Sequence, residues 1–239
     1  MDADFLINIL LPALWGGLLV TLKLIVLSAP FGLLFGVLVA VGRVYGGKGV
    51  NLLCRFFVGF VKGCPLLLLL FILYFGLPSI GIYLTALSAS IIGFICCNSA
   101  YNSEYIRGAI LSVKEGQMVA ASALGMTKTQ AIRYVVLPQA MRRAIPGLSN
   151  EFIYLIKYSS LAYMITLIEL TGAGKLVFSK YFEPDVFMMI GAVYLALVTI
   201  TTICANALER KLSIPGTPGH SVKIKNPAKI KKNNKKTTG

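Results

Sequence analysis

Histidine is almost absent from this chain, which holds a single one, His220, among 239 residues. A histidine-based catalytic or metal centre is therefore excluded within one chain, because such a centre needs several ligating or proton-transferring groups. The sequence also has no Cys-x-x-Cys pair. Its five cysteines lie mostly in or beside apolar runs, which is typical of small buried hydrophobic residues and predicts neither a disulfide framework nor a metal site. They are Cys54, Cys64, Cys96, Cys97 and Cys204.

Charged residues are scarce as well. They make up 13% of the chain, whereas hydrophobic residues make up 56% and the mean hydropathy is +0.78. Soluble domains carry roughly twice that share of charge, so a bilayer is the solvent that this composition fits. The start of the chain is acidic and lacks a basic leader, and we expect no cleavable signal there.

Acidic residues number 9 against 23 basic ones, which gives a net charge of +14. Much of the excess lies in residues 215–239, a stretch rich in lysine, asparagine and proline without apolar periodicity. This composition predicts a basic, solvated and disordered cytoplasmic tail. Anionic lipid headgroups are its expected neighbour, and we expect no nucleic-acid partner.

Long apolar runs predict an all-α membrane protein with about five transmembrane helices in one domain, residues 1–214. Basic residues gather in alternate loops, and by the positive-inside rule this predicts an N-terminus outside and a C-terminus inside the cell. Pro65 is expected to set the point at which the second span begins. The expected spans cover residues 10–42, 58–77, 84–113, 147–170 and 186–209.

A polar segment, about residues 115–146, interrupts the apolar blocks. An alanine-rich run within it predicts a short helix near 118–127, which Gly125 ends as a C-terminal glycine does. On the residues alone, two interpretations of this segment are open. It is either a cytoplasmic docking element for a partner or a generic amphipathic linker.

The second helix of this segment is expected to begin at a threonine cap, either Thr127 or Thr129. Its apolar residues repeat at helical spacing. Pro138 and Pro146 are then expected to kink the chain before it re-enters the membrane.

The spacing of this segment resembles the loop shared by membrane subunits of ABC importers. That loop reads Glu-Ala-Ala, three residues, Gly, nine residues, and then Ile, any residue, Leu-Pro. Here Val119-Ala120-Ala121 is followed by three residues and Gly125, and nine more lead to Val135-Val136-Leu137-Pro138. Over about residues 10–212 the chain also resembles the polar amino-acid permeases of the histidine, glutamine, glutamate and arginine branch. The stretches that carry this likeness are KGCPLLLLLFILYFGLP, YNSEYIRGAILSVKEGQ and LPQAMRRAIPGLSNEFIYLIKYSSL.

The resemblance implies a type I ABC importer permease with a cytoplasmic coupling helix. Such a subunit forms the transmembrane path for amino-acid uptake in an ATP-driven importer of the cell membrane, and it is not itself an enzyme. A separate pair of ATPase subunits would hold ATP and magnesium, so we expect this chain to bind no cofactor. The other implied partners are a second permease subunit, identical or related, and an extracytoplasmic solute-binding protein. The residues implied to contact the ATPase are Val119, Ala120, Ala121, Ala123, Leu124 and Gly125.

Two positions depart from the family's pattern. The glutamate of the loop is Val119 here, so anchoring to the ATPase would rest mainly on apolar packing. Tyr158 stands where the family commonly has aspartate after the lysine, which weakens the expectation of a cationic substrate.

Polar residues inside the predicted spans are candidates for the substrate path, because a charge in lipid is costly and usually faces a cavity or a partner. We expect Glu104 to meet a substrate ammonium, with Asn98 and Asn102 offering amide groups nearby. The alternative for Glu104 is a polar network that joins helices. Tyr158 either contributes to the path by stacking or lines a helix seam, and Glu151 fits a structural role better.

Gly32 and Gly36 form a Gly-x-x-x-Gly pattern in the first span, which lets helix backbones approach closely. Contact within the chain and contact between subunits are both open. Other functions also stay open: a channel with a docking loop, or a membrane-embedded enzyme, although the clustered groups of an active site are missing. The one phosphate-loop candidate, Gly172–Lys175, fails the P-loop pattern because Glu169 and Leu176 occupy two of its required positions.

Overall fold

The computed structural model describes residues 2–212, and every regular element within that range is helical. The predicted basic tail, residues 215–239, lies outside the described residues, as does His220. The elements are α1 (Ala3–Phe5), η1 (Leu6–Leu10), α2 (Leu11–Tyr45), α3 (Lys48–Gly63), α4 (Leu66–Phe71), η2 (Ile72–Gly76), η3 (Leu77–Ile80), α5 (Ala86–Leu111), α6 (Gly116–Ala123), α7 (Lys128–Ala131), η4 (Ile132–Val136), α8 (Leu137–Tyr158), η5 (Ser159–Ile165), α9 (Leu170–Tyr181) and α10 (Asp185–Leu212). The all-α prediction is confirmed for this range.

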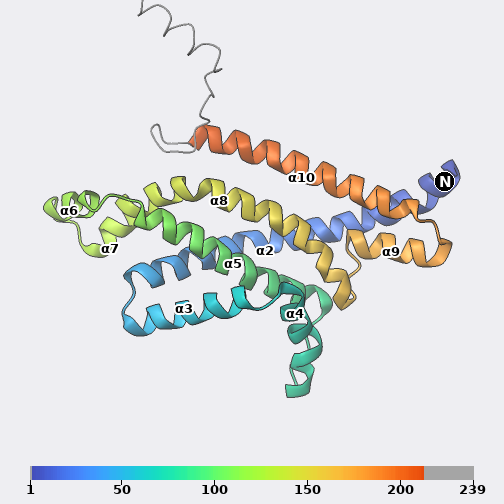
Figure 1. The fold of residues 1–239 in the computed structure, drawn as a ribbon, viewed down its shortest axis with the longest axis horizontal. Coiled ribbons are helices and arrows are strands. Elements are labelled where there is room, and N and C mark those ends of the chain that lie inside the picture. The colour runs from blue at the N-terminus through green and yellow to red at the C-terminus, as the bar shows by residue number, and fades with distance from the viewer. Residues whose placement is uncertain (1, 213–239) are drawn as a thin grey trace, which may run out of the picture.

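The long helices α2, α5, α8 and α10 run lengthwise through the molecule (Figure 1). Helix α5 contacts α2 on one side and α8 on another, so it forms the centre of the bundle. Helices α6 and α7 make up one end, whereas the N-terminus and α9 lie at the opposite end (Figure 1). The segment that begins with α4 leaves the bundle sideways (Figure 1).

The Gly-x-x-x-Gly pattern of α2 packs inside the chain, against α5. A Cβ atom added at Gly32 would lie 2.9 Å from Cβ of Asn98, and one added at Gly36 would lie 2.7 Å from Cβ of Asn102. Only glycine lets the two helices come this close. The intramolecular interpretation of the pattern is therefore correct, and this seam fixes where the two asparagines lie.

Candidate membrane spans agree only partly with the predicted limits. By length and apolarity, residues Ala3–Tyr45 and Asp185–Leu212 each form a helix able to cross a bilayer, and two bent helix pairs raise the number to at most 4. Helix α5, which corresponds to the predicted span 84–113, does not meet that standard, because asparagines and serines fill its buried face. Neighbouring helices surround it and take the place of lipid. The number of spans and the orientation of the chain stay predictions.

The predicted second span, residues 58–77, is not one straight helix. Residues 58–63 end α3, and the chain then bends by 102° before it continues as Leu66–Ile80. Pro65 stands at this bend and directly precedes α4. It therefore marks the start of a helix, and the start of a membrane span at this point stays a prediction. Apolar residues lie on both sides of the bend, which is why the sequence alone joined the two parts.

The kink expected at Pro138 and Pro146 does not interrupt the helix, and the bend itself stays a prediction. The chain is helical without a break from Lys128 to Ile165, through both prolines. A proline inside a helix removes one hydrogen bond and crowds the preceding turn. The wider π turn Ile132–Val136 comes directly before Pro138, and the Gln139 side chain donates a hydrogen bond to the Val135 carbonyl at 2.9 Å. The π turn thus accommodates the proline and lets the helix continue.

Glu169 belongs to a buried junction rather than to an exposed loop. Its carboxylate caps α9 by accepting hydrogen bonds from the backbone N–H groups of Thr171 at 3.0 Å and Gly172 at 2.9 Å. The Tyr194 hydroxyl of α10 donates to the same carboxylate at 2.8 Å, and Thr21 of α2 accepts a bond from the N–H of Leu170 at 3.1 Å. A fully buried acid is tolerated here because each oxygen has donors.

Candidate coupling helix and substrate path

Helix α6 forms the outermost tip of one end of the bundle (Figure 1). Gly125 ends it with φ +80°, a left-handed conformation that suits glycine. The N–H of Gly125 donates to the Ser122 carbonyl at 3.0 Å and the N–H of Met126 donates to the Ala121 carbonyl at 3.1 Å. The prediction of a short helix closed by this glycine is confirmed.

The next helix begins at Thr127, which decides between the two predicted threonine caps. Its hydroxyl accepts a hydrogen bond from the N–H of Gln130, and the Gln130 side chain accepts one from the N–H of Thr127 at 2.8 Å. This reciprocal pair is a capping box. Together, Gly125 and Thr127 fix the sharp turn between α6 and the long helix that leads into the bundle.

The six predicted coupling residues do not all face the same way. Ala121 is buried and holds α6 to its own chain. Val119 and Leu124 have 69% and 80% of their side chains exposed. These two large apolar side chains at the tip of the molecule are not packed in the core of their own chain. They therefore present an exposed apolar surface of the kind that contacts a partner. The remaining members, Ala120, Ala123 and Gly125, are exposed.

Two side-chain contacts connect the α6 region to α8. Gln139 donates a hydrogen bond to the Gln117 side chain at 3.2 Å, and Arg143 donates to the Ser112 hydroxyl at 2.9 Å and also to the Ser112 carbonyl. A displacement of α6 would therefore reach both α5, whose last turn precedes Ser112, and α8.

Asn98 and Asn102 line a cavity of about 650 Å³ between α2, α5, α8 and α10. The Asn102 amide donates to Oδ1 of Asn98 at 2.7 Å, but Oδ1 of Asn102 is buried and has no hydrogen-bond partner among the described residues. A buried acceptor without a donor is uncommon. It is suited to accept a hydrogen bond from a ligand that enters the cavity.

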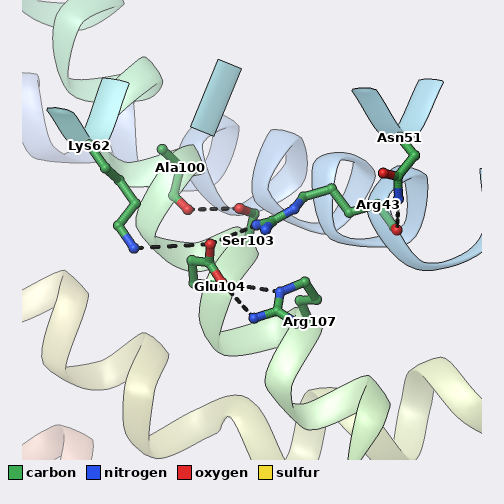
Figure 2. Close-up of polar contacts among 7 residues, drawn as sticks. All are labelled: Arg43, Asn51, Lys62, Ala100, Ser103, Glu104 and Arg107. Atoms are coloured by element: carbon green, nitrogen blue, oxygen red, sulfur yellow. Dashed lines mark hydrogen bonds and ion pairs between the residues drawn. The ribbon is translucent and has the colours of Figure 1, made fainter. Parts of the chain in front are cut away.

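Glu104 does not line that cavity. It lies among three basic side chains (Figure 2). Arg43 of α2 donates to one carboxylate oxygen at 2.7 Å, Arg107 of α5 donates to the other at 3.0 Å, and the Nζ of Lys62 of α3 lies 4.0 Å away. These contacts favour the interpretation in which Glu104 joins helices over direct contact with a substrate ammonium.

Tyr158 lies near the end of α8 and stacks on Tyr154, with ring centroids 5.8 Å apart. Both belong to a polar cluster that sequence reasoning missed. At its centre is Glu151, which is 3% exposed and forms no hydrogen bond or ion pair among the described residues. The face of α5 that carries Cys97 and Tyr101 packs on this part of α8, because Tyr105, one turn from Tyr101, lies against Gly147, one turn from Glu151.

A signal for Glu151 was present in the sequence. Glu151 and Tyr158 are seven residues apart in one predicted span, which places them on the same side of a helix, two turns apart. Its position close to the start of that predicted span suggested a structural role instead. The helix actually begins much earlier, at Lys128, so Glu151 lies deep within it.

Metal and nucleotide sites find no support in the described part of the chain. Residues 2–212 contain no group of three or more histidine, cysteine, aspartate or glutamate side chains that could hold a metal ion. The run Gly172–Lys175 lies in the first turns of α9. It packs as a helix and does not form a phosphate-binding loop.

Comparison with known proteins agrees with this architecture. Residues 32–214 match the model of the family described as binding-protein-dependent transport system inner membrane component. The chain is 38% identical over 192 residues to the Probable amino-acid ABC transporter permease protein YckA of Bacillus subtilis, covering 80% of this chain and 85% of that protein. It is 31% identical over 207 residues to the glutamine transport system permease protein GlnP of Escherichia coli, covering 85% and 94% of the two chains.

Solved structures show the same arrangement of helices. The crystal structure of an amino acid ABC transporter with histidines matches with a TM-score of 0.79 and 32% identity, covering 88% of this chain and 100% of that one. An inward-facing form of the MetNI methionine ABC transporter matches with a TM-score of 0.73 at 20% identity, covering 90% and 100% of the two chains, and supports the fold alone. The chain belongs to the family of binding-protein-dependent transport system inner membrane components, and it is a permease subunit of an ABC importer in the cell membrane.

Proposed function

We propose that this chain forms the transmembrane path for a polar amino acid and that a separate ATPase subunit supplies the energy. The names of its relatives include amino-acid and glutamine permeases. The observation that carries the coupling is the exposed apolar tip of α6, where Val119 and Leu124 have no partner within residues 2–212. The proposed complete importer contains a pair of ATPases that bind ATP and magnesium, a second permease subunit and an extracytoplasmic solute-binding protein.

In this proposal α6 is the coupling helix and the α6 end of the bundle faces the cytoplasm. Val119 and Leu124 insert into an apolar cleft of the ATPase, and this packing replaces the contact that a glutamate at position 119 would make. Closure of the ATPase pair moves α6, and the contacts of Gln139 and Arg143 pass the movement to α8 and α5. Nucleotide binding then biases a two-state membrane domain.

The substrate path uses polar groups of α5 and α8. Asn98 and Asn102 supply amide groups at the wall of the cavity, and the free Oδ1 of Asn102 accepts a hydrogen bond from the substrate. We assign the substrate ammonium to Glu151, because it is a buried carboxylate without a cationic partner in the described chain. Like Glu104 it lies outside the lining of that cavity, although Leu148 and Phe152 of the same helix line it. Tyr158 supplies no second negative charge at the position where the family's pattern has aspartate, which favours a neutral polar amino acid over a cationic one.

Transport by the reconstituted complex tests this function. Vesicles that contain this chain, its ATPase and its binding protein are expected to accumulate a labelled neutral polar amino acid only when ATP is present on the ATPase side. Accumulation without ATP, or none with any amino acid when the complex is intact and hydrolyses ATP, would contradict the proposal.

A crosslinking experiment tests the coupling helix separately. Ala123→Cys, at the exposed tip, should crosslink to the ATPase subunit during turnover. Tyr83→Cys is the matched control, because Tyr83 is 80% exposed but lies in the turn before α5, far along the chain from α6. Equal capture of the ATPase from both positions, or from neither, would be evidence against α6 as the contact.

A further inference from the structure

Helix α3 is joined to the rest of the chain by a break at each end. Before it, Gly46 and Gly47 leave the helical conformation, with ψ values of 156° and 169°. After it, the chain bends by 102° on the way to α4, and Pro65 at the bend has no N–H to donate. Residues at the ends of elements are the usual hinges of moving segments. α3 can therefore change its tilt while the hydrogen bonds inside α2 and α4 stay intact. Its side-chain bond to α2, from Asn51 to the Arg43 carbonyl, lies beside the first break, at the end about which the helix would turn.

The inner face of α3 packs on the part of α5 that carries Cys97 and Tyr101. Val58 and Val61 pack on Cys97 and Ala100 of α5. The Nζ of Lys62 lies 5.5 Å from the ring centroid of Tyr101. Since Cys97 and Tyr101 lie on α5 between α3 and the part of α8 that carries Glu151, α3 forms an outer wall of the site proposed for the substrate ammonium.

The contact of α3 with Glu104 is weaker than the contacts that fix Glu104 itself. Arg43 and Arg107 hold the carboxylate at 2.7 and 3.0 Å, and both belong to the α2–α5 core. The Lys62 ion pair is longer, at 4.0 Å, and the Lys62 side chain is 37% exposed (Figure 2). Exposed ion pairs add little to stability, so this contact can open at small cost while Glu104 stays in place.

The outer face of α3 makes no compensating contacts within the described chain. Its large apolar side chains are exposed. The exposed members are Val50, Leu52, Leu53, Phe56 and Phe60.

Near its start, helix α3 is held to α2 by the Asn51 bond to the Arg43 carbonyl and by Cys54 against Gly42. Its far half is held by the packing of Phe57, Val58 and Val61 and by the contacts of Lys62.

We propose that α3 is an inner gate of the transport path and that the Lys62–Glu104 pair is its latch. When the substrate moves from Glu151 towards the α6 end, the latch opens and α3 tilts away from Cys97 and Tyr101. Glu104 acts as a positioning residue that gives the latch a fixed anchor on α2 and α5. This inference rests on the proposed function, since it needs a substrate that passes Glu151.

A disulfide between α2 and α3 tests whether α3 moves. A Cβ atom at Gly42 would lie 3.0 Å from Sγ of Cys54, which is about the span from a Cβ to the far sulfur of a disulfide. Oxidised Gly42→Cys protein in the complete complex is expected to lose at least about tenfold in uptake, and reductant should restore it. Gly42→Cys combined with Cys54→Ser is the matched control and should transport equally under both conditions.

The outcomes separate the gate from the proposed function. A crosslinked subunit that transports at the parent rate would overturn the gate and leave the function intact. A parent complex that transports no amino acid would instead remove the function on which the gate depends.

Thiol labelling gives a second measurement that needs no engineered bond. In a variant whose only cysteine is Cys97, which is 7% exposed beneath α3, a water-soluble thiol reagent should react several-fold faster during ATP turnover than at rest. Lys62→Gln should raise the resting rate as well, because the latch is lost. Arg55→Gln removes a charge from an exposed position of the same helix and should leave the labelling rate of Cys97 unchanged, both at rest and during turnover. The gate would be contradicted if Cys97 were labelled at one rate in the resting parent, in the parent during turnover and in the two variants.

Discussion

At the scale of single residues, the fold depends on glycines that face amides and on polar side chains that have all their partners. Gly32 and Gly36 let α2 touch Asn98 and Asn102, and Glu169 is buried because backbone and hydroxyl donors surround it. The sequence showed the glycine spacing but not the partner helix. It could not show the Glu169 junction, since one donor hydroxyl belongs to Tyr194, 25 positions away along the chain, and another to Thr21, 148 positions away.

The first prediction concerns the α2–α5 seam. Gly36→Ala places a methyl group 2.7 Å from Cβ of Asn102 and should destabilise the subunit by about 1–3 kcal/mol through overpacking. Gly16→Ala on the same helix meets nothing within 4 Å and should leave stability unchanged or slightly raised. Thermal unfolding in detergent compares the two. Equal midpoints would show that the seam is looser than described.

The second prediction concerns the cap of α9. Glu169→Ala leaves the N–H groups of Thr171 and Gly172 and the Tyr194 hydroxyl without their acceptor, at a cost of about 1–3 kcal/mol. Glu183→Ala, in the turn before α10, removes the same charge at a partly exposed position and is expected to have little effect. The denaturant concentration at the unfolding midpoint is compared for the two variants. Equal midpoints would show that the Glu169 cap does not stabilise the subunit.

At the scale of elements, turns and breaks decide what each helix can do. Gly125 and Thr127 project α6 from the tip, and the break at Pro65 separates α3 from α4. Turn residues act locally, so the sequence predicted the α6 closure, a threonine cap at one of two positions and a boundary at Pro65. The π turn before Pro138 was not predicted, and local rules did not show that the helix continues through this proline.

The third prediction concerns the turn after α6. Gly125→Ala forces an alanine to φ +80°, which costs about 1 kcal/mol and shifts the direction of α6. Uptake by the complex should fall, whereas insertion of the subunit should not. Gly116→Ala, at the start of the same helix and in open space, is the control and should keep full uptake. A Gly125→Ala complex that couples normally would mean that the orientation of α6 is unimportant.

At the scale of the whole molecule, a polar helix lies at the centre of an apolar bundle. Helix α5 brings Asn98 and Asn102 to one side, where the cavity lies, and Cys97, Tyr101 and Glu104 towards α3. Lipid-facing side chains of α2 and α10 remain exposed around it. The molecule thus separates a path-lining interior from an outer surface that suits lipid or partner subunits.

The fourth prediction concerns the end of the chain. Removal of the residues after Ile214 should leave membrane insertion, assembly and uptake unchanged, because their composition predicts no packed structure. Membrane fractionation and co-purification with the ATPase check this. A truncated chain that fails to insert would show that the basic tail has a role in the fold or its topology.

The amino-acid sequence by itself determined that the chain suits a lipid bilayer and that it is helical. It also determined the turn that closes α6 and the spacing that resembles importer permeases. These features depend on composition and on residues close together in the chain, so local physical rules are sufficient. Only the tertiary structure decided the partners of polar groups in lipid. It paired Glu104 with basic residues from three helices and left Glu151 alone. Which buried acid is neutralised and which is free for a ligand depends on side chains distant in sequence, and no local pattern encodes that proximity.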